Sequence, residues 1–147
     1  MKDTLKVTGH INFKLFDKDG AFKDERDINN LVVTAGKNYL AAWLAAASQA
    51  DYFMKYVALG EGLTAAQSTD LALETELTSR VIGTISSSTN VWQNQATFGP
   101  GVNTGAITEA GLFSASTLGT LFARQVFAVI NKSAGDTLQV TWQITIS

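Results

Sequence analysis

Apolar and polar residues alternate regularly along two stretches at opposite ends of the chain. In residues 4–16 the odd positions hold Leu, Val, Gly, Ile and Phe, while the even ones from 6 to 14 hold Lys, Thr, His and Asn. In residues 137–146, Leu138, Val140 and Trp142 share one face with two isoleucines, and Thr and Gln share the other. A period of two is typical of a β-strand with one face in a core. We therefore predict a strand at each end and place Trp142 in the core.

Further strands are indicated by short runs of apolar and β-branched residues, separated by Gly, Ser and Asn. Asp19-Gly20 favours a tight turn that joins the first strand to the second. Ser88-Thr89 marks a second turn between two strands that we expect to pair. The predicted strands between the two ends cover residues 21–33, 52–59, 78–87, 90–98, 107–114 and 118–130.

One helix interrupts this pattern after the second strand, and we predict it from residue 35 to about residue 48. Thr34 is a suitable N-cap residue. Leu40, Trp43, Leu44 and Ala47 follow the i, i+3, i+4, i+7 spacing of a stripe that faces a core.

The chain is expected to form a single mainly β domain over residues 1–147, because it fits the size of one domain and contains no linker or repeat. About eight antiparallel strands with one inserted helix favour a jelly-roll-like β-sandwich. We expect a charged N-terminal hairpin at residues 1–28. Residues 60–77 are expected to form a flexible arm, either irregular or with one short helix, and a helix reaching Arg80 would pair it with Glu76.

Charge is distributed very unevenly along the sequence. The first 27 residues hold twelve of the 24 charged residues, whereas the last 67 hold only four, Glu109, Arg124, Lys132 and Asp136. A typical domain is about 25% charged, and those side chains keep its surface hydrated. Thr, Ser, Asn and Gln replace them in the second half of this chain. This composition indicates a surface that lies against other proteins.

Composition also argues against several classes of function. The net charge of −2, without a cluster of Lys or Arg, opposes nucleic-acid binding. The chain has no cysteine, so thiolate metal sites and disulfides are excluded. No apolar segment is long enough to cross a bilayer, and no secretory signal precedes the first strand. We expect synthesis in a cytoplasm, with no membrane partner and no cofactor.

Candidate catalytic groups are few. His10 is the only histidine, and it lies on the polar face of the first strand, where we interpret it as solvated. Asp17-Lys18-Asp19-Gly20 resembles the start of a calcium loop but lacks the later ligands, so a hairpin turn explains it better. The acidic group of residues 61–76 could provide paired carboxylates, but a solvated or partner-binding arm is the simpler interpretation. We expect no metal site and no enzyme.

Several segments of the sequence resemble a known family. They are Tyr56–Gly62, Thr69–Leu77 with Arg80, Ala96–Phe98, Ile107–Phe113, and an ending that holds Asn131-Lys132 and Gly135–Trp142. Their order and spacing resemble small virion proteins of tailed bacteriophages, some of which are jelly-roll decoration or cement proteins of the head. The resemblance implies a non-enzymatic structural component of a virus particle.

From this resemblance we expect a cement protein on the capsid exterior that bridges subunits of the major capsid protein, as a homodimer or another small homo-oligomer. The arm and the hairpin are the expected contact elements. The alternative is a tail- or fibre-associated module that binds a host surface glycan, for which Trp92 is the candidate exposed aromatic. The residues expected to contact the partner are Glu61, Asp70, Glu74, Glu76, Arg80, Lys18, Lys23 and Arg26.

Overall fold

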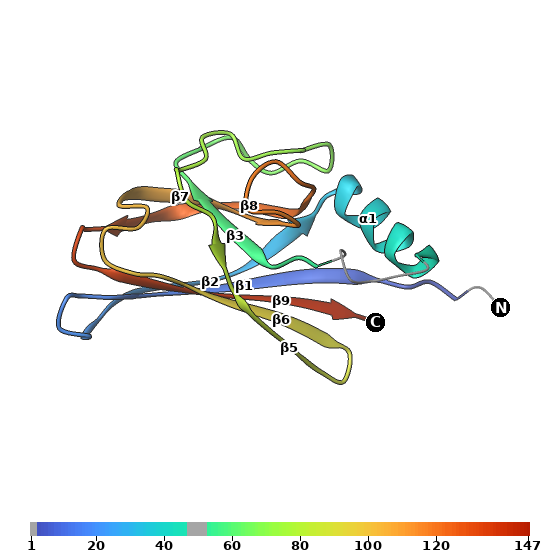
Figure 1. The fold of residues 1–147 in the computed structure, drawn as a ribbon, viewed down its shortest axis with the longest axis horizontal. Helices are drawn as coiled ribbons and strands as arrows, with labels where there is room; N and C mark the ends of the chain where they lie inside the picture. Colours follow the sequence, from blue (N-terminus) through green and yellow to red (C-terminus); the bar gives the residue numbers. More distant parts are fainter. Residues whose placement is uncertain (1–2, 47–52) are drawn as a thin grey trace.

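The computed structural model describes residues 3–46 and 53–147. These residues form an antiparallel β-structure of nine strands and one helix, so the predicted mainly β class is confirmed. Figure 1 shows the arrangement. The elements are β1 (Val7–Phe16), β2 (Phe22–Val32), α1 (Thr34–Ala45), β3 (Tyr56–Gly60), β4 (Val81–Ile82), β5 (Thr84–Ser88), β6 (Val91–Phe98), β7 (Gly105–Phe113), β8 (Leu121–Lys132) and β9 (Thr137–Ile146).

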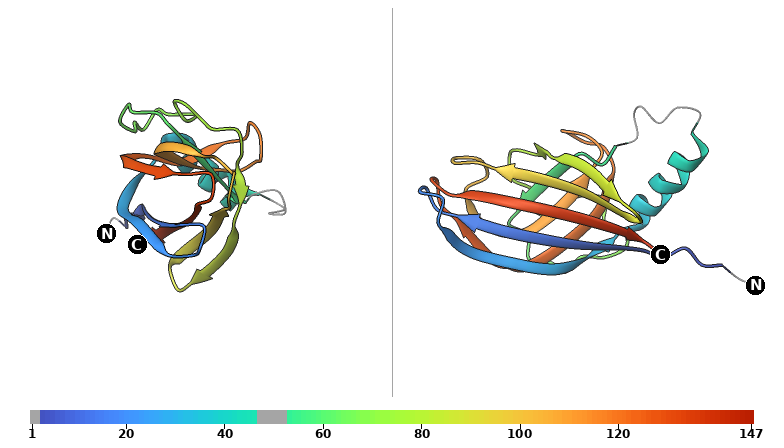
Figure 2. Two further views of the ribbon diagram at one scale, coloured as in Figure 1. Left: turned by 90° about the vertical axis from the view of Figure 1, so that its left-hand side faces the viewer. Right: turned by 90° about the horizontal axis from the view of Figure 1, so that it is seen from below.

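The nine strands follow the order β4-β3-β7-β8-β2-β1-β9-β6-β5, and every neighbouring pair is antiparallel. β2 links two layers, because it pairs with β1 along its length and with β8 only through Leu31 and Val32. The order therefore curls into an upper sheet of β4, β3, β7, β8 and the end of β2, and a lower sheet of β2, β1, β9, β6 and β5. Seen end-on in Figure 2, the two sheets form a nearly closed barrel.

On the opposite side of the barrel, the chain crosses from one sheet to the other at Gly83. The sequence predicts one strand over residues 78–87, but the chain bends at Gly83, so that β4 joins the upper sheet and β5 the lower. The Gly83 N–H donates to the Lys55 carbonyl at 2.8 Å, and a Cβ on Gly83 would collide with the Asn94 side chain. This corner accounts for nine strands where about eight are predicted. Strands that switch sheets at a bend are a usual way to make such corners.

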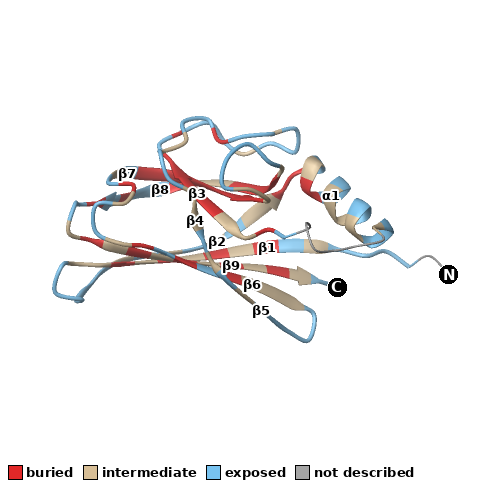
Figure 3. Ribbon diagram, in the orientation of Figure 1, coloured by how far each residue is buried: buried red, intermediate tan, exposed pale blue. Residues whose placement is uncertain are grey.

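The core lies between the two sheets and follows the predicted alternation. Burial along β9 alternates at every position from Thr137 to Thr145, and Trp142 is fully buried as expected. β1 shows the same pattern, with Ile11 and Phe13 fully buried. Figure 3 shows buried residues in both sheets and exposed ones in the loops.

Helix α1 departs from the prediction in its bounds and in its packing. It begins at Thr34 rather than residue 35 and ends at Ala45, and Val33 occupies the N-cap position without a side-chain cap. Gly36 is its only buried residue, since it packs directly on the Phe122 backbone. Tyr39 and Leu40 still pack against the core, and towards its C-terminal end the helix diverges from the barrel (Figure 2). The predicted core stripe is therefore wrong at Leu44, which is 68% exposed. The last positions of the predicted helix lie outside the described residues.

The first two strands form the predicted hairpin, and its turn is held by Asp17. The Asp17 carboxylate accepts hydrogen bonds from the backbone N–H groups of Asp19 and Ala21, both at 2.9 Å. Gly20 adopts φ +82°, which suits a residue without a Cβ. β1 also pairs with β9 over ten residues, so the hairpin is an integral part of the lower sheet.

Candidate functional site: a clamped arm and an open polar face

All four charged residues of the last 67 are buried. Glu109, Lys132, Arg124 and Asp136 are only 0, 2, 3 and 4% exposed. The structure describes every residue from 81 to 147, so the outer surface of this half of the chain carries no charged side chain. The sequence predicts few charges here, but their burial follows from the tertiary structure.

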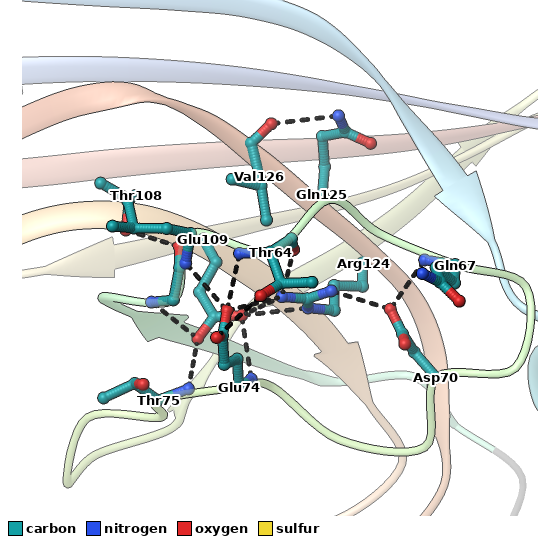
Figure 4. A network of polar contacts seen from close by, with 12 residues as sticks. Thr64, Gln67, Asp70, Glu74, Thr75, Thr108, Glu109, Arg124, Gln125 and Val126 are labelled. Carbon is teal, nitrogen blue, oxygen red and sulfur yellow. Dashed lines mark hydrogen bonds and ion pairs between the residues drawn. The ribbon is translucent and has the colours of Figure 1, made fainter.

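Two of these charges, Glu109 on β7 and Arg124 on β8, form the centre of a buried network shown in Figure 4. The Arg124 guanidinium contacts Glu109 Oε2 at 2.9 Å and Asp70 Oδ2 at 2.8 Å. It also donates to the Thr64 carbonyl at 3.0 Å. Burial alone would lower the pKa of Arg124, but its hydrogen bonds to Asp70 and Glu109 outweigh that effect and raise it. The guanidinium therefore stays charged between the sheet and the arm.

Glu109 also binds the backbone of the arm. Its carboxylate accepts N–H groups from Gly62, Glu74 and Thr75 at 3.1, 3.1 and 2.7 Å. A carboxylate that receives several N–H donors satisfies backbone groups that would otherwise be buried without partners. The arm is thereby fixed across the outer face of the upper sheet. Residues 60–77 contain no helix, which agrees with the irregular form of the predicted arm.

Glu74 closes a loop within the arm. Its carboxylate accepts the N–H groups of Thr64 and Leu63 at 2.7 and 2.9 Å, and the Thr64 hydroxyl at 2.8 Å. The bond from the Thr64 N–H is the main reason that the pKa of Glu74 is lowered. Glu74 is therefore occupied by its own chain, like Asp70.

The remaining predicted contact residues of the arm region also have partners within the chain. Glu61 accepts the Ala106 N–H at 3.2 Å. Arg80 pairs with Glu76, as the spacing suggests, although no helix joins them. Its guanidinium also stacks 3.6 Å above the centre of the Phe113 ring. These side chains attach the arm to the upper sheet.

The predicted contact residues of the hairpin differ in how strongly other parts of the chain bind them. Lys23 pairs with buried Asp136 at 2.7 Å, and this bond is the main reason that the pKa of Asp136 is lowered. Arg26 pairs with Asp24 and donates to two carbonyls of β8. Lys18 is 78% exposed, and its amine lies 3.5 Å from the carboxylate of its neighbour Asp19. Whether these residues contact a partner stays a prediction.

The composition of the second half of the chain predicts an uncharged surface that lies against other proteins, and the Thr and Gln alternation of residues 137–146 marks one strand of it. The structure shows which strands combine to form this surface on the outside of the lower sheet. The outward side chains of β5, β6 and β9 form what we call the polar face. Cross-strand hydrogen bonds connect it, from Gln143 to Gln93 at 2.9 Å and from Gln95 to Thr141 at 3.3 Å. Apart from Val91 at one end, its residues are Thr84, Ser86, Ser88, Gln93, Gln95, Thr97, Thr137, Gln139, Thr141, Gln143 and Thr145.

The outer faces of the two sheets therefore differ in what covers them. The arm covers the outer face of the upper sheet, whereas no loop or helix of the described residues lies over the polar face (Figures 1 and 2). Next to the polar face, β1 and β2 carry His10 beside Asp27, at 2.6 Å, and Lys14 opposite Glu25. The lower sheet thus has an uncharged half and a charged half.

Trp92 does not belong to the polar face. Its strand neighbours Asn94 and Ala96 are buried on the inner side, and Trp92 lines an apolar groove at one end of the barrel. The groove has a volume of about 380 Å³ and is bordered by α1. Its other lining residues are Tyr39, Leu40, Trp43, Phe53, Met54, Ile85, Leu112, Phe122, Ile144 and Ile146.

Within the described residues, no helix is long and apolar enough to cross a membrane. No group of three or more His, Asp or Glu side chains in residues 3–46 and 53–147 is arranged to hold a metal ion.

No protein-family model, curated protein or solved structure matches this chain. The resemblance to virion proteins is therefore carried only by the sequence segments quoted above.

Proposed function

We propose that the protein is a structural component of a virus particle, a capsid cement protein. In this proposal the polar face binds the outside of the shell across neighbouring subunits of the major capsid protein. The charged strands β1 and β2 remain in solvent beside the contact. The observation that carries the proposal is the burial of all four charges of residues 81–147 beside an open, uncharged sheet face.

An uncharged polar face suits a permanent protein contact. Charged groups lose much hydration free energy when an interface covers them, and they recover it only with well-placed partners. Ser, Thr and Gln side chains cost less to cover and still form hydrogen bonds across the contact. A surface exposed only to water has no need to exclude charge. The composition of the polar face is therefore that of a surface covered in the assembled state.

The sequence resemblance supports the same role. Its segments include residues of the arm and of β7, which the Glu109 network joins. In the proposal this network keeps the upper sheet and its arm rigid, so that the barrel resists deformation when the shell is under pressure. The arm residues then act inside the molecule, while the polar face provides the contact.

The glycan-binding alternative receives less support. It requires an exposed aromatic ring beside clustered amide side chains. Trp92 points into the apolar groove, whereas Gln93 and Gln95 point outward from the same strand. The ring and the amides therefore lie on opposite sides of the sheet and form no common platform.

The experiment is to reconstitute particles with wild-type protein and with Thr141→Lys, which places a charge midway along β9 in the polar face. We expect the wild type to bind at a copy number close to that of the major capsid protein and to raise the temperature at which particles break. Thr141→Lys should remain folded and lose binding at least tenfold.

The matched control is Asn29→Lys, which adds the same charge to the exposed outer face of the same sheet, on β2. It should bind like the wild type. Equal binding by all three proteins, or a few copies of the wild type per particle, would refute a cement role through the polar face.

A further inference from the structure

Strand β5 forms an open edge of the lower sheet. It is the last strand of the order and pairs with β6 over five residues, Thr84 to Ser88. Among residues 3–46 and 53–147, no other strand pairs with β5. In an antiparallel pair every second residue turns its N–H and C=O away from the partner. β5 therefore presents backbone donors and acceptors along its free edge.

This edge lacks the features that usually prevent pairing with another chain. Proteins protect edge strands with charged side chains, proline or bulges. No charged residue occurs between positions 81 and 108, and β5 contains no proline. Its register with β6 has no shift that would indicate a bulge. An unprotected edge of this kind is a surface on which another strand can add.

We propose that the occupant of this edge is β5 of a second copy of the chain. The two strands pair antiparallel about a two-fold axis and join two lower sheets into one continuous sheet. This pairing requires no virus shell, so it can be tested separately from the proposed function.

The sequence of β5 is compatible with itself in this arrangement. A two-fold axis at Ser86 places Ser86 opposite its own copy, Thr84 opposite Ser88, and Ile85 opposite Ser87. Small hydroxyl side chains face one another across the axis, and no like charges meet. In a two-fold interface the same patch must complement itself, and this strand meets that condition.

Within the proposed function, the size of the polar face gives a second reason for a second copy. Three strands about 4.8 Å apart and roughly eight residues long cover about 400 Å². A stable protein contact buries about 800 Å² on each partner. One polar face thus supplies about half of that area, and two faces joined through β5 supply it in full. The dimer would present one continuous uncharged face.

The test is sedimentation velocity of the purified full-length chain, without shell protein. At about 100 µM, well above a micromolar Kd, we expect a species of twice the 15.7 kDa chain mass. Ser86→Lys and Ser86→Glu each place like charges together at the axis, and each should weaken the dimer at least tenfold. An equal mixture of the two variants should restore it, because Lys then faces Glu.

Thr97→Lys is the control, because it adds a charge to the outward face of β6, away from the β5 edge. It should remain dimeric, and circular dichroism should show that all variants are folded. A monomeric wild type, a dimer unaffected by both Ser86 variants, or a mixture that stays monomeric would each overturn the pairing. Because no shell is present, a failure here leaves the binding experiment on particles unaffected.

Discussion

Glu109 illustrates what a single buried charge contributes to this fold. Its carboxylate satisfies Arg124 and three N–H groups of the arm while having no exposed surface. A well-bonded buried ion pair is not necessarily more stabilising than an apolar pair of similar volume. Its loss is costly, however, because Arg124 then keeps only the less buried carboxylates of the arm as countercharges, and the three N–H groups lose a charged acceptor. The network therefore determines where the arm lies more than it adds net stability.

Replacing Glu109 with Gln should reduce the free energy of unfolding by about 3 kcal/mol, because Arg124 loses its buried countercharge. Urea unfolding measures this loss, and limited proteolysis should show faster cleavage within residues 60–77. The matched control, Glu61→Gln, removes the charge of an exposed residue that accepts one hydrogen bond. It should cost no more than about 1 kcal/mol. A similar loss of unfolding free energy in both variants would contradict the role of Glu109 in fixing the arm.

Glu74 should make stability depend on pH in the acidic range. Its pKa is lowered from 4.5 because the folded state donates hydrogen bonds to its ionised form. A carboxyl group with a lowered folded pKa stabilises the fold above its unfolded pKa, and this contribution is lost as pH falls through the folded value. Urea midpoints measured from pH 6 to pH 3 should therefore fall more for the wild type than for Glu74→Gln. Parallel curves would exclude this role for Glu74.

At the scale of elements, the bend at Gly83 decides how the barrel closes. The chain crosses from the upper to the lower sheet there, and Gly83 lies so close to the Asn94 side chain that no Cβ fits. Asn94 is itself fully buried and donates to the Met54 carbonyl at 3.0 Å. The corner therefore depends on a glycine facing a fixed amide.

Gly83→Ala should lower the melting temperature by about 3–10 °C, since overpacking of a buried contact costs about 1–3 kcal/mol. Gly99→Ala is the control, because an added Cβ there meets no atom within 4 Å. That variant should melt within about 2 °C of the wild type. A wild-type melting temperature for Gly83→Ala would show that the corner accepts a side chain.

For the whole molecule, the main feature is the separation of charge between two halves of one sheet. The charged half consists of β1 and β2, which contain the predicted contact residues Lys23 and Arg26. The uncharged half is the polar face. Binding of a particle through the charged half and binding through the uncharged half are expected to respond differently to salt.

Binding through the polar face should change less than about twofold between 50 and 500 mM salt, because no charges are screened. Binding through Lys18, Lys23 and Arg26 should weaken by tenfold or more over the same range. Co-sedimentation of the protein with particles at several salt concentrations measures the difference. Strong salt dependence would place the contact on the hairpin, as the sequence-based expectation has it, rather than on the polar face.

The local pattern of the sequence determined the strands, their inward faces and the first turn. Trp142 and the alternation of β9 are where a period of two places them, because the direction of a side chain from a strand depends only on its position in the pleat. The same alternation distinguishes the outward Thr and Gln residues. About half of the residues of the polar face, those on β9, could thus be predicted before the fold was known.

The tertiary structure alone decided which of these surfaces are covered. Glu109 and Asp70 are 39 positions apart, and only the folding of the arm across β7 and β8 brings both to Arg124. Leu44 fits an apolar stripe but stays exposed, since α1 diverges from the barrel beyond Leu40. Burial and ion pairing depend on residues distant in sequence, and no local period encodes them.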